Sequence, residues 1–338
     1  MAILGNPVSK KQLKMGVSTQ NIETDIFSDF EKDLIAGLSA TNKSIPSKYL
    51  YDNKGDRLFR KIMKLPEYYL SKAETEILRN NKEKLFTLCC SREPFKLIDL
   101  GVGDASKTAI LIRYFYTQKV HFEFIPIDIS KNILDIARKK IKTAFPKIKV
   151  TPINADYFTA LSTLLDYSEK KLLLFLGSNL GNFKKEEAIT FLRNINTRLR
   201  KGDMLLLGLD LKKDPEKIQK AYSDSKGITQ AFNLNLLKRI NTELHANFKI
   251  KNFSHYCMYN PFTGEEKSFL ISKIHQAVSI EKIQKSFTFE QWEAIQTECS
   301  NKYDHQSIAS LADSSNFSII ETFFDRKNYF TDVLLEKI

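Results

Sequence analysis

Long apolar runs are absent from this chain, and cysteine is scarce, with four among 338 residues. No apolar run reaches the roughly 18–20 residues that cross a membrane as a helix. The first residues lack the apolar core that follows a basic start in a secretory leader. We therefore expect a cytoplasmic protein that does not act at a membrane.

The cysteine pattern excludes two further classes of protein. Cys89, Cys90, Cys257 and Cys299 form no C-x-x-C pair and have no metal-ligand spacing with histidine. Cys89 and Cys90 are adjacent within an apolar stretch. We expect buried, reduced thiols rather than a disulfide framework, and no metal site.

Acidic residues are outnumbered, because 52 Lys and Arg stand against 40 Asp and Glu, a net charge of +12. Such a charge is compatible with nucleic acid or an acidic membrane surface as a partner. The lysines are spread along the chain, however, and the densest cluster, between Arg138 and Lys149, lacks the aromatic pattern of an RNA-binding signature. We predict a solvated lysine-rich face without a nucleic-acid or obligate protein partner. A polyanion site remains the alternative.

Short apolar runs alternate with helical segments between residues 95 and 211. This rhythm is typical of βαβ units and predicts an α/β fold with a doubly wound, Rossmann-like parallel sheet. The fourth run is apolar throughout, as in a strand buried on both faces. The five predicted strands cover 95–100, 122–127, 149–153, 171–177 and 204–211.

The flanking segments follow different patterns. Apolar spacing predicts helices over 25–38 and 55–64, and Ser71 with Glu74 has the spacing of a capping box that opens the next helix. Beyond residue 211 the alternation of strands and helices stops. We expect a helical region over 215–246, a hairpin of antiparallel strands over 248–259 and 265–279, helices over 289–296 and 304–313, and strands over 317–324 and 329–337.

A glycine loop follows the first predicted strand. Glycines at Gly101 and Gly103 let a backbone come close to a ligand at the strand ends, and Asp99 precedes them. The third glycine of a dinucleotide fingerprint is missing, so the loop alone is weak evidence. Asp99 and Gly101 can also serve the amino end of a methionine moiety.

Two acidic residues at later strand ends narrow the ligand. Asp128 ends the second strand, where a carboxylate accepts hydrogen bonds from both ribose hydroxyls. Asp156 and Tyr157 follow the third strand, where a carboxylate and a flat ring hold an adenine. An adenosine without a pyrophosphate fits this set, and S-adenosylmethionine (SAM) therefore fits better than NAD. Lys107 either pairs with the SAM carboxylate or faces solvent.

Several further blocks resemble the histidine-specific Nα-methyltransferases of ergothioneine biosynthesis. The resemblance covers roughly residues 30–338. The blocks that carry it are PSKYLYD at 46–52, LPEYY at 65–69 with Glu74, FLGSNLGN at 175–182, GLDLKKD at 208–214, and matching stretches within 221–235, 241–244 and 297–303.

The resemblance implies a SAM-methyltransferase domain interrupted by a split α+β substrate-binding domain. Residues 1–22 would be a flexible N-terminus. Residues 23–70 with 213–302 would bind the substrate, and residues 71–212 with 303–338 would bind SAM. The implied reaction is methylation of the α-amino group of L-histidine, three times, to give hercynine.

The resemblance also assigns an acceptor site. Asn182, Tyr68 and Tyr222 would bind the substrate carboxylate through neutral donors. Glu298 and Ser300 would hold the imidazole, whose two nitrogens suit a carboxylate and a hydroxyl. Three more residues, Tyr51, Phe59 and Gly177, would line the pocket around the amine. Of all these residues, Tyr51, Asn182 and Tyr222 are the predicted catalytic residues.

The sequence departs from the family at three places. Ser268 stands where methionine is common near the imidazole, Asn179 replaces a threonine, and 70–73 differs from the usual block. Ser268 keeps open the same chemistry on another amino acid or on a thiolated histidine. Less favoured alternatives are a nucleic-acid methyltransferase, which no Pro-Pro-Tyr/Phe motif after the fourth strand supports, and a non-catalytic SAM sensor.

Overall fold

Apolar runs between residues 95 and 210 form the parallel part of an eight-stranded sheet in the computed structural model, which describes residues 28–89, 93–162 and 167–338. The order is β12-β13-β6-β5-β1-β2-β3, and β4 also pairs with β2. The last two strands are antiparallel and close one edge. The strands are β1 (Phe95–Leu100), β2 (Phe122–Asp128), β3 (Lys149–Val150), β4 (Ile153–Asn154), β5 (Lys170–Phe175), β6 (Met204–Asp210), β12 (Phe317–Phe324) and β13 (Phe330–Lys337).

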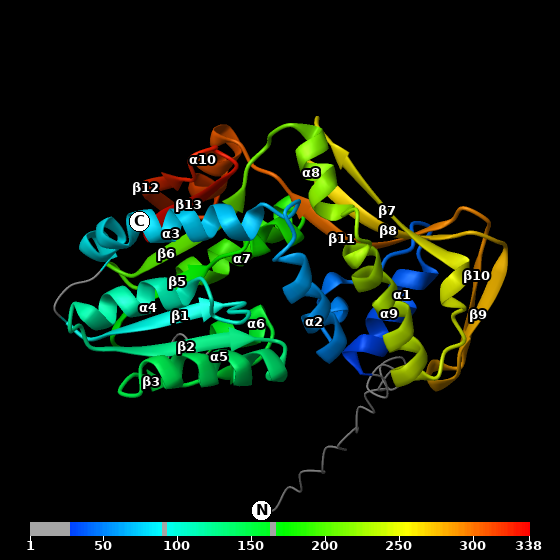
Figure 1. Ribbon diagram of the computed structural model, residues 1–338, viewed down its shortest axis with the longest axis horizontal. Helices are drawn as coiled ribbons and strands as arrows, with labels where there is room; N and C mark the ends of the chain where they lie inside the picture. The colour runs from blue at the N-terminus through cyan, green and yellow to red at the C-terminus, as the bar shows by residue number, and fades with distance from the viewer. Residues whose placement is uncertain (1–27, 90–92, 163–166) are drawn as a thin grey trace, which may run out of the picture.

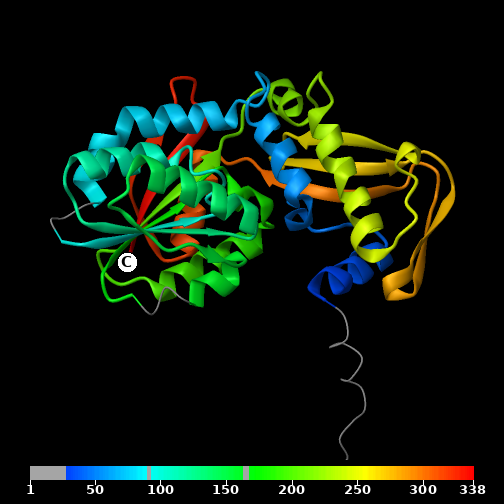
Figure 2. The same ribbon diagram turned by 60° about the horizontal axis from the view of Figure 1, so that its bottom comes forward.

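Helices cover both faces of this sheet (Figures 1 and 2). Because the strands are buried on both sides, two separate apolar cores form, one on each face. Helices α3 (Leu70–Cys89), α4 (Thr108–Thr117) and α5 (Lys131–Ala144) pack on one face, and α6 (Tyr157–Ser162), α7 (Lys185–Arg198) and α10 (His305–Ser314) on the other. Strand β1 pairs with β2 on one side and with β5 on the other. The connections that follow β1 and β5 therefore run in opposite directions, and a crevice opens between them at the carboxyl ends of these strands.

A second lobe lies beside the first (Figure 1). Strands β7 (Phe253–Asn260), β8 (Glu265–Ser272) and β11 (Ala294–Asn301) form an antiparallel sheet, and β9 (Gln276–Ile280) pairs with β10 (Lys285–Phe289). Its helices are α1 (Asp29–Ser39), α2 (Asn53–Ile62), α8 (Pro215–Tyr222) and α9 (Ile228–Leu244). Short 3-10 turns are η1 (Ser47–Leu50), η3 (Asn179–Asn182), η4 (Ile250–Asn252) and η5 (Glu281–Ile283).

The structure confirms most of the predicted elements and corrects four. The run predicted over 265–279 divides into β8 and β9. The segment 289–296 is not a helix, because Phe289 ends β10, residues 290–293 form a turn with Trp292 exposed, and β11 begins at Ala294. The predicted third strand is split into β3 and β4. Ser71 does not cap a helix, since α3 already begins at Leu70 and Glu74 turns inward. The predicted flexible segment 1–22, residues 25–27 of the first helix, and Cys90 lie outside the described residues.

The contacts of α3 and α9 bear on the predicted division into domains. Helix α3 contacts α4, β6, β12 and β13 of the large sheet, whereas α9 contacts α2, β7 and β8. The boundaries at 70, 212 and 302 stay a prediction. Among the described residues, no helix has the length and apolar character needed to span a bilayer.

Candidate active site

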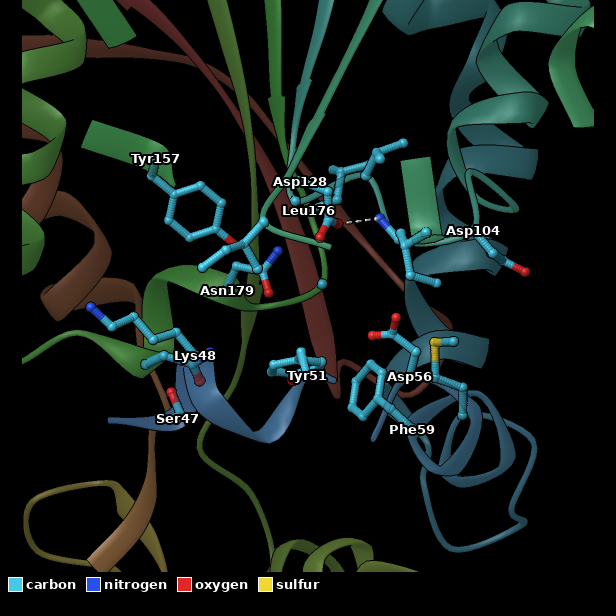
Figure 3. Close-up of a pocket in the computed structure, with 18 of the residues that line it drawn as sticks. Ser47, Lys48, Tyr51, Asp56, Phe59, Asp104, Asp128, Tyr157, Leu176 and Asn179 are labelled. Carbon is cyan, nitrogen blue, oxygen red and sulfur yellow. Dashed lines mark hydrogen bonds between the residues drawn. The ribbon is translucent and has the colours of Figure 1, made fainter. Parts of the chain in front are cut away.

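A cavity of about 460 Å³ opens at the carboxyl ends of the parallel strands. This volume is in the range of small-molecule sites. Figure 3 shows Asp128, Tyr157 and Asn179 on the side of the strand ends, and Tyr51, Phe59 and Asp56 across from them. The cavity therefore lies between the large sheet and the segment that contains α2.

The glycine loop borders this cavity closely. Gly101 has φ +73°, and a Cβ there would lie 2.6 Å from Tyr157 Oη and 2.7 Å from Asn179 Nδ2. Only glycine satisfies both the left-handed backbone and the lack of space. The Gly103 N–H donates to Asp128 Oδ2 at 3.1 Å (Figure 3). The loop thus holds the Asp128 carboxylate at the edge of the cavity.

Asp128 and Asp156 differ in environment. Burial raises the pKa of Asp128 to about 6, although the Ser130 and Gly103 N–H groups oppose the shift. The exposed Asp156 carboxylate accepts the Phe158 and Thr159 N–H groups at 2.9 and 3.0 Å, which opens α6. These bonds outweigh its desolvation and lower its pKa. Asp156 therefore has a structural role, and its predicted contact with an adenine stays a prediction.

Tyr157 packs its ring edge-on against Phe175, with centroids 5.1 Å apart. Asp99, by contrast, is not among the residues that line the cavity. Its buried carboxylate accepts the Thr108 hydroxyl, and burial raises its pKa to about 7. The predicted contact of Asp99 with a ligand stays a prediction.

Lys107 pairs with Glu74, at the rim of the cavity. Glu74 also accepts the Gly177 N–H at 2.6 Å, which explains why it does not serve as a capping residue. Gly177 itself has φ +80° and faces Lys107 Nζ, which would lie 3.1 Å from a Cβ there. Lys107 thus forms an ion pair at the cavity rather than facing solvent alone, and its predicted pairing with the SAM carboxylate stays a prediction.

Asp332 lies beside this ion pair with both carboxylate oxygens buried and without a hydrogen-bond partner among the described residues. Burial and the nearby Glu74 raise its pKa well above the usual value. The folded protein therefore binds a proton that the unfolded chain releases as pH rises above about 4, so stability falls with rising pH.

Replacing Asp332 by asparagine should remove this loss. We expect D332N to be more stable by at least about 2 kcal/mol at pH 8, because the wild type loses about 1.4 kcal/mol for each pH unit above the unfolded pKa of about 4 at which its folded carboxyl keeps the proton. At pH 4 the neutral acid and the amide should be nearly equal. Thermal unfolding at both pH values measures the difference, and an equal gain at pH 4 and pH 8 would contradict the assignment.

Aromatic residues form the opposite wall of the cavity. Tyr51 meets Phe59 and Phe232 edge-on at centroid distances of 5.4 and 5.5 Å, and Phe59 meets Tyr68 at 6.1 Å. Asp52 caps α2 by accepting the Gly55 N–H at 2.6 Å, which fixes the backbone next to Tyr51. Burial raises the pKa values of Tyr51 and Tyr68 far above normal, so both hydroxyls stay protonated donors.

Asn182 lies at the end of η3, which the other lobe holds in place. The Asn301 amide donates to the carbonyls of Gly181 and Phe183 at 3.0 and 2.6 Å. Ser178, in the left-handed region at φ 59°, accepts the Asp210 N–H at 3.1 Å. Strand β11 and strand β6 together therefore position Asn182 at the cavity.

A buried polar cluster lies behind the aromatic wall. Tyr222 donates to Ser300 Oγ at 2.9 Å, and Lys302 Nζ donates to both hydroxyls at 2.8 and 2.7 Å. Lys302 is also 3.0 Å from an Asp210 oxygen. Because the Lys302 ammonium can only donate, both hydroxyls accept from it. Tyr222 gives its proton to Ser300, so the Ser300 hydroxyl proton is the one that can be donated to a further group.

Glu298 and Ser268 face this cluster from neighbouring strands, opposite each other in the register of β11 and β8. Burial raises the pKa of Glu298 to about 7, against the opposing charge of Lys302. Tyr51 and Tyr68 both lie within the electrostatic reach of Glu298. These tyrosines thus connect the cavity with the cluster.

The predicted site residues therefore fall into two groups. Those at the cavity are Tyr51, Phe59, Tyr68, Gly101, Gly103, Lys107, Asp128, Asp156, Tyr157, Gly177 and Asn182. Those outside its lining are Asp99, Tyr222, Ser268, Glu298 and Ser300.

Sequence reasoning missed three residues that organise the site. Asp56 of α2 accepts the Ser130 hydroxyl at 2.6 Å across the cavity. Lys302 and Glu266 are buried in the cluster. A lysine two residues after Ser300 and a glutamate two before Ser268, each with strand periodicity, were the signals available.

One protein family matches the chain over residues 30–337, and it is described as histidine-specific, SAM-dependent methyltransferases. The chain belongs to this family. SAM is therefore its methyl donor. The cavity fits this donor in two respects. Any side chain at Gly101 would fill the space beside Tyr157, so the glycine keeps that space open for the cofactor. The Asp128 carboxyl at the cavity edge suits the two hydroxyls of the ribose.

Three relatives named for the amino acid on which they act are similar to the chain along most of its length. It is 32% identical over 284 residues to the histidine N-alpha-methyltransferase of Mycolicibacterium smegmatis, covering 84% of this chain and 87% of that protein. The enzyme of the same name from Mycobacterium tuberculosis is 32% identical over 279 residues, covering 82% and 86%. The L-tryptophan methyltransferase of Psilocybe serbica is 25% identical over 311 residues, covering 85% and 86%.

Proposed function

We propose that this methyltransferase transfers methyl groups from SAM to the α-amino group of L-histidine, three in succession, giving hercynine on the route to ergothioneine. The observation that carries the proposal is the family match over residues 30–337. The partly buried carboxyl of Glu298 behind the aromatic wall supports it, because an imidazole N–H needs such an acceptor.

The chemistry asks the protein chiefly to position the acceptor. SAM supplies a methyl group on a positively charged sulfur, and the nucleophile is a neutral amine. The amine must lie near 3–3.5 Å from the methyl carbon with its lone pair in line. Tyr51, Phe59 and Gly177 border the cavity next to the glycine loop, where the amine would receive its methyl groups.

The substrate carboxylate is assigned to neutral donors. Asn182 offers an amide, and Tyr68 offers a hydroxyl that burial keeps protonated. The Tyr222 hydroxyl is also protonated, and it would have to turn its proton from Ser300 to the substrate. Neutral donors bind the substrate carboxylate without adding a cation that would also pair with the Glu298 carboxylate. Lys302 and Asp210 balance each other's charge. The substrate can therefore form hydrogen bonds with the remaining donors and acceptors of the cluster without leaving a charge unpaired.

A second acceptor is favoured by one observation. Ser268, fully buried, is small and polar where the family commonly has methionine. The space released suits another amino acid or a histidine that carries sulfur on its ring. A relative that is 25% identical to the chain is named for tryptophan, which supports a different acceptor on this framework.

An acceptor panel separates these possibilities. Purified protein is incubated with SAM and each amino acid, including a thiolated histidine, and release of S-adenosylhomocysteine is measured. We expect kcat/KM for histidine to exceed that for tryptophan about 10³-fold or more, because an apolar ring leaves buried polar groups unpaired. A reaction without acceptor corrects for SAM breakdown. A higher kcat/KM for any other acceptor contradicts the proposal.

A further inference from the structure

Strand β8 places two polar side chains on the buried face of the small sheet. Its residues alternate in burial, and Glu266 and Ser268 both point inward with no exposed surface. Ser268 is opposite Glu298 in the register with β11, and Glu266 is opposite Ser300. Cβ atoms of such directly opposed residues lie about 4.5–5.5 Å apart. These four side chains therefore share one small area of the sheet.

Three of these groups lack hydrogen-bond partners. Both Glu266 oxygens and Ser268 Oγ are buried without a partner among the described residues. The pKa of Glu298 responds to burial and to Lys302, with no hydrogen bond from a described residue. Each unmade hydrogen bond of a buried group costs about 1–3 kcal/mol. Lys302 does not supply the missing bonds, because Asp210, Tyr222 and Ser300 occupy its ammonium.

The charges of the two glutamates are unequal. Burial and the neighbouring Glu298 raise the pKa of Glu266 well above its usual value, and Ser268 opposes that shift without meeting hydrogen-bond geometry. Two close carboxyls in a dry site do not both ionise. Glu266 is consequently the neutral acid, and Glu298 is the group that titrates near pH 7.

We propose that Glu266 and Ser268 are positioning residues that form a hydrogen-bond relay to Glu298. The Glu266 O–H donates to Ser268 Oγ, and the Ser268 hydroxyl donates to a Glu298 oxygen. No proton is gained or lost, and all three groups become paired through side-chain rotation alone. The relay holds Glu298 ionised and aimed to accept the N–H of the acceptor's ring, and this last role rests on the proposed function.

The relay also explains why a serine is tolerated at position 268. A methionine there could not pass a hydrogen bond from Glu266 to Glu298. The serine and the buried acid two residues before it therefore act as one unit on the same strand face.

The test compares four variants in the full chain. S268A and E266L break the relay, whereas E266Q keeps a donor at position 266. S272A is the matched control, since Ser272 lies on the same buried face of β8 but donates to the Ile274 carbonyl at 2.8 Å. Two quantities are measured in each: the Kd for histidine by calorimetry, and the pKa of the Glu298 carboxyl by NMR with ¹³C-labelled glutamate, assigned with E298Q.

We expect S268A and E266L to weaken histidine binding about tenfold or more, as for loss of a hydrogen bond to a charged group. Both should also raise the pKa of Glu298, while E266Q and S272A resemble the wild type. Other charged or titratable groups near Glu298 are unchanged in all variants. They are Lys302, Tyr51, Tyr68, Tyr222 and Cys257.

Two results would overturn the relay. The first is an unchanged Glu298 pKa in S268A and E266L, and the second is an E266Q variant as impaired as E266L. The NMR titration needs no acceptor. A wild type that does not bind histidine therefore refutes the proposed function, while the Glu298 pKa still decides the relay.

Discussion

Replacing Glu298 by alanine is expected to lower kcat/KM for histidine about 10³-fold while SAM binds as before. The reason is that the ring N–H would enter a buried site without an acceptor. Steady-state kinetics with histidine as the varied substrate give the first quantity, and calorimetry with SAM gives the second. Equal losses of histidine use and SAM affinity would contradict the assignment of Glu298 to the acceptor.

The pH profile sharpens this prediction. Burial raises the pKa of Glu298 to about 7, so its carboxylate form is lost as pH falls through 7. We expect kcat/KM for histidine to rise between pH 6 and 8 with a contribution from this group. E298Q keeps the shape and one acceptor oxygen but cannot titrate, so that contribution should vanish in it.

Replacing Asp128 by alanine is expected to raise the Kd for SAM about 10²–10³-fold. The Asp128 carboxylate accepts the Gly103 N–H at 3.1 Å and the Ser130 N–H at 3.0 Å at the cavity edge. It is therefore aimed by the backbone, and it is expected to accept two further bonds from the ribose hydroxyls. Calorimetric titration with SAM measures the change.

Asp104 provides the matched control for this variant. It belongs to the same loop and borders the same cavity, but its carboxylate pairs with Lys140 at 3.3 Å and accepts the Ser106 N–H at 3.0 Å. We expect D104A to alter the Kd for SAM less than about fivefold, because exposed ion pairs contribute little. A similar loss in both variants would show that the loop, and not the Asp128 carboxylate, determines affinity.

The large sheet was predictable because its physics is local. Strands buried on both faces are continuous apolar runs, as in β5, and the helices between them have clear amphipathic spacing. The small sheet was harder to predict. Residues 289–296 combine charged, aromatic and apolar residues, and only pairing with β8 shows that β11 is a strand.

The cavity side of the site was predictable for a similar reason. Gly101 and Asp128 follow strands whose carboxyl ends must meet at one edge of a parallel sheet. The roles of Lys302 and Glu266 depend instead on contacts between segments distant in sequence. The Lys302 ammonium reaches Asp210 of β6 and Tyr222 of α8, and strand periodicity marks the face on which Lys302 and Glu266 lie but does not predict these contacts.

The most direct test of the central claim is mass spectrometry of L-histidine after incubation with the protein and SAM. The account predicts products heavier by about 14, 28 and 42 Da, with every methyl group on the α-nitrogen, because one bound amine is presented repeatedly to the donor. Fragmentation separates the α-nitrogen from the ring nitrogens. Histidine that remains unmodified, or that is methylated on the ring, would contradict the account.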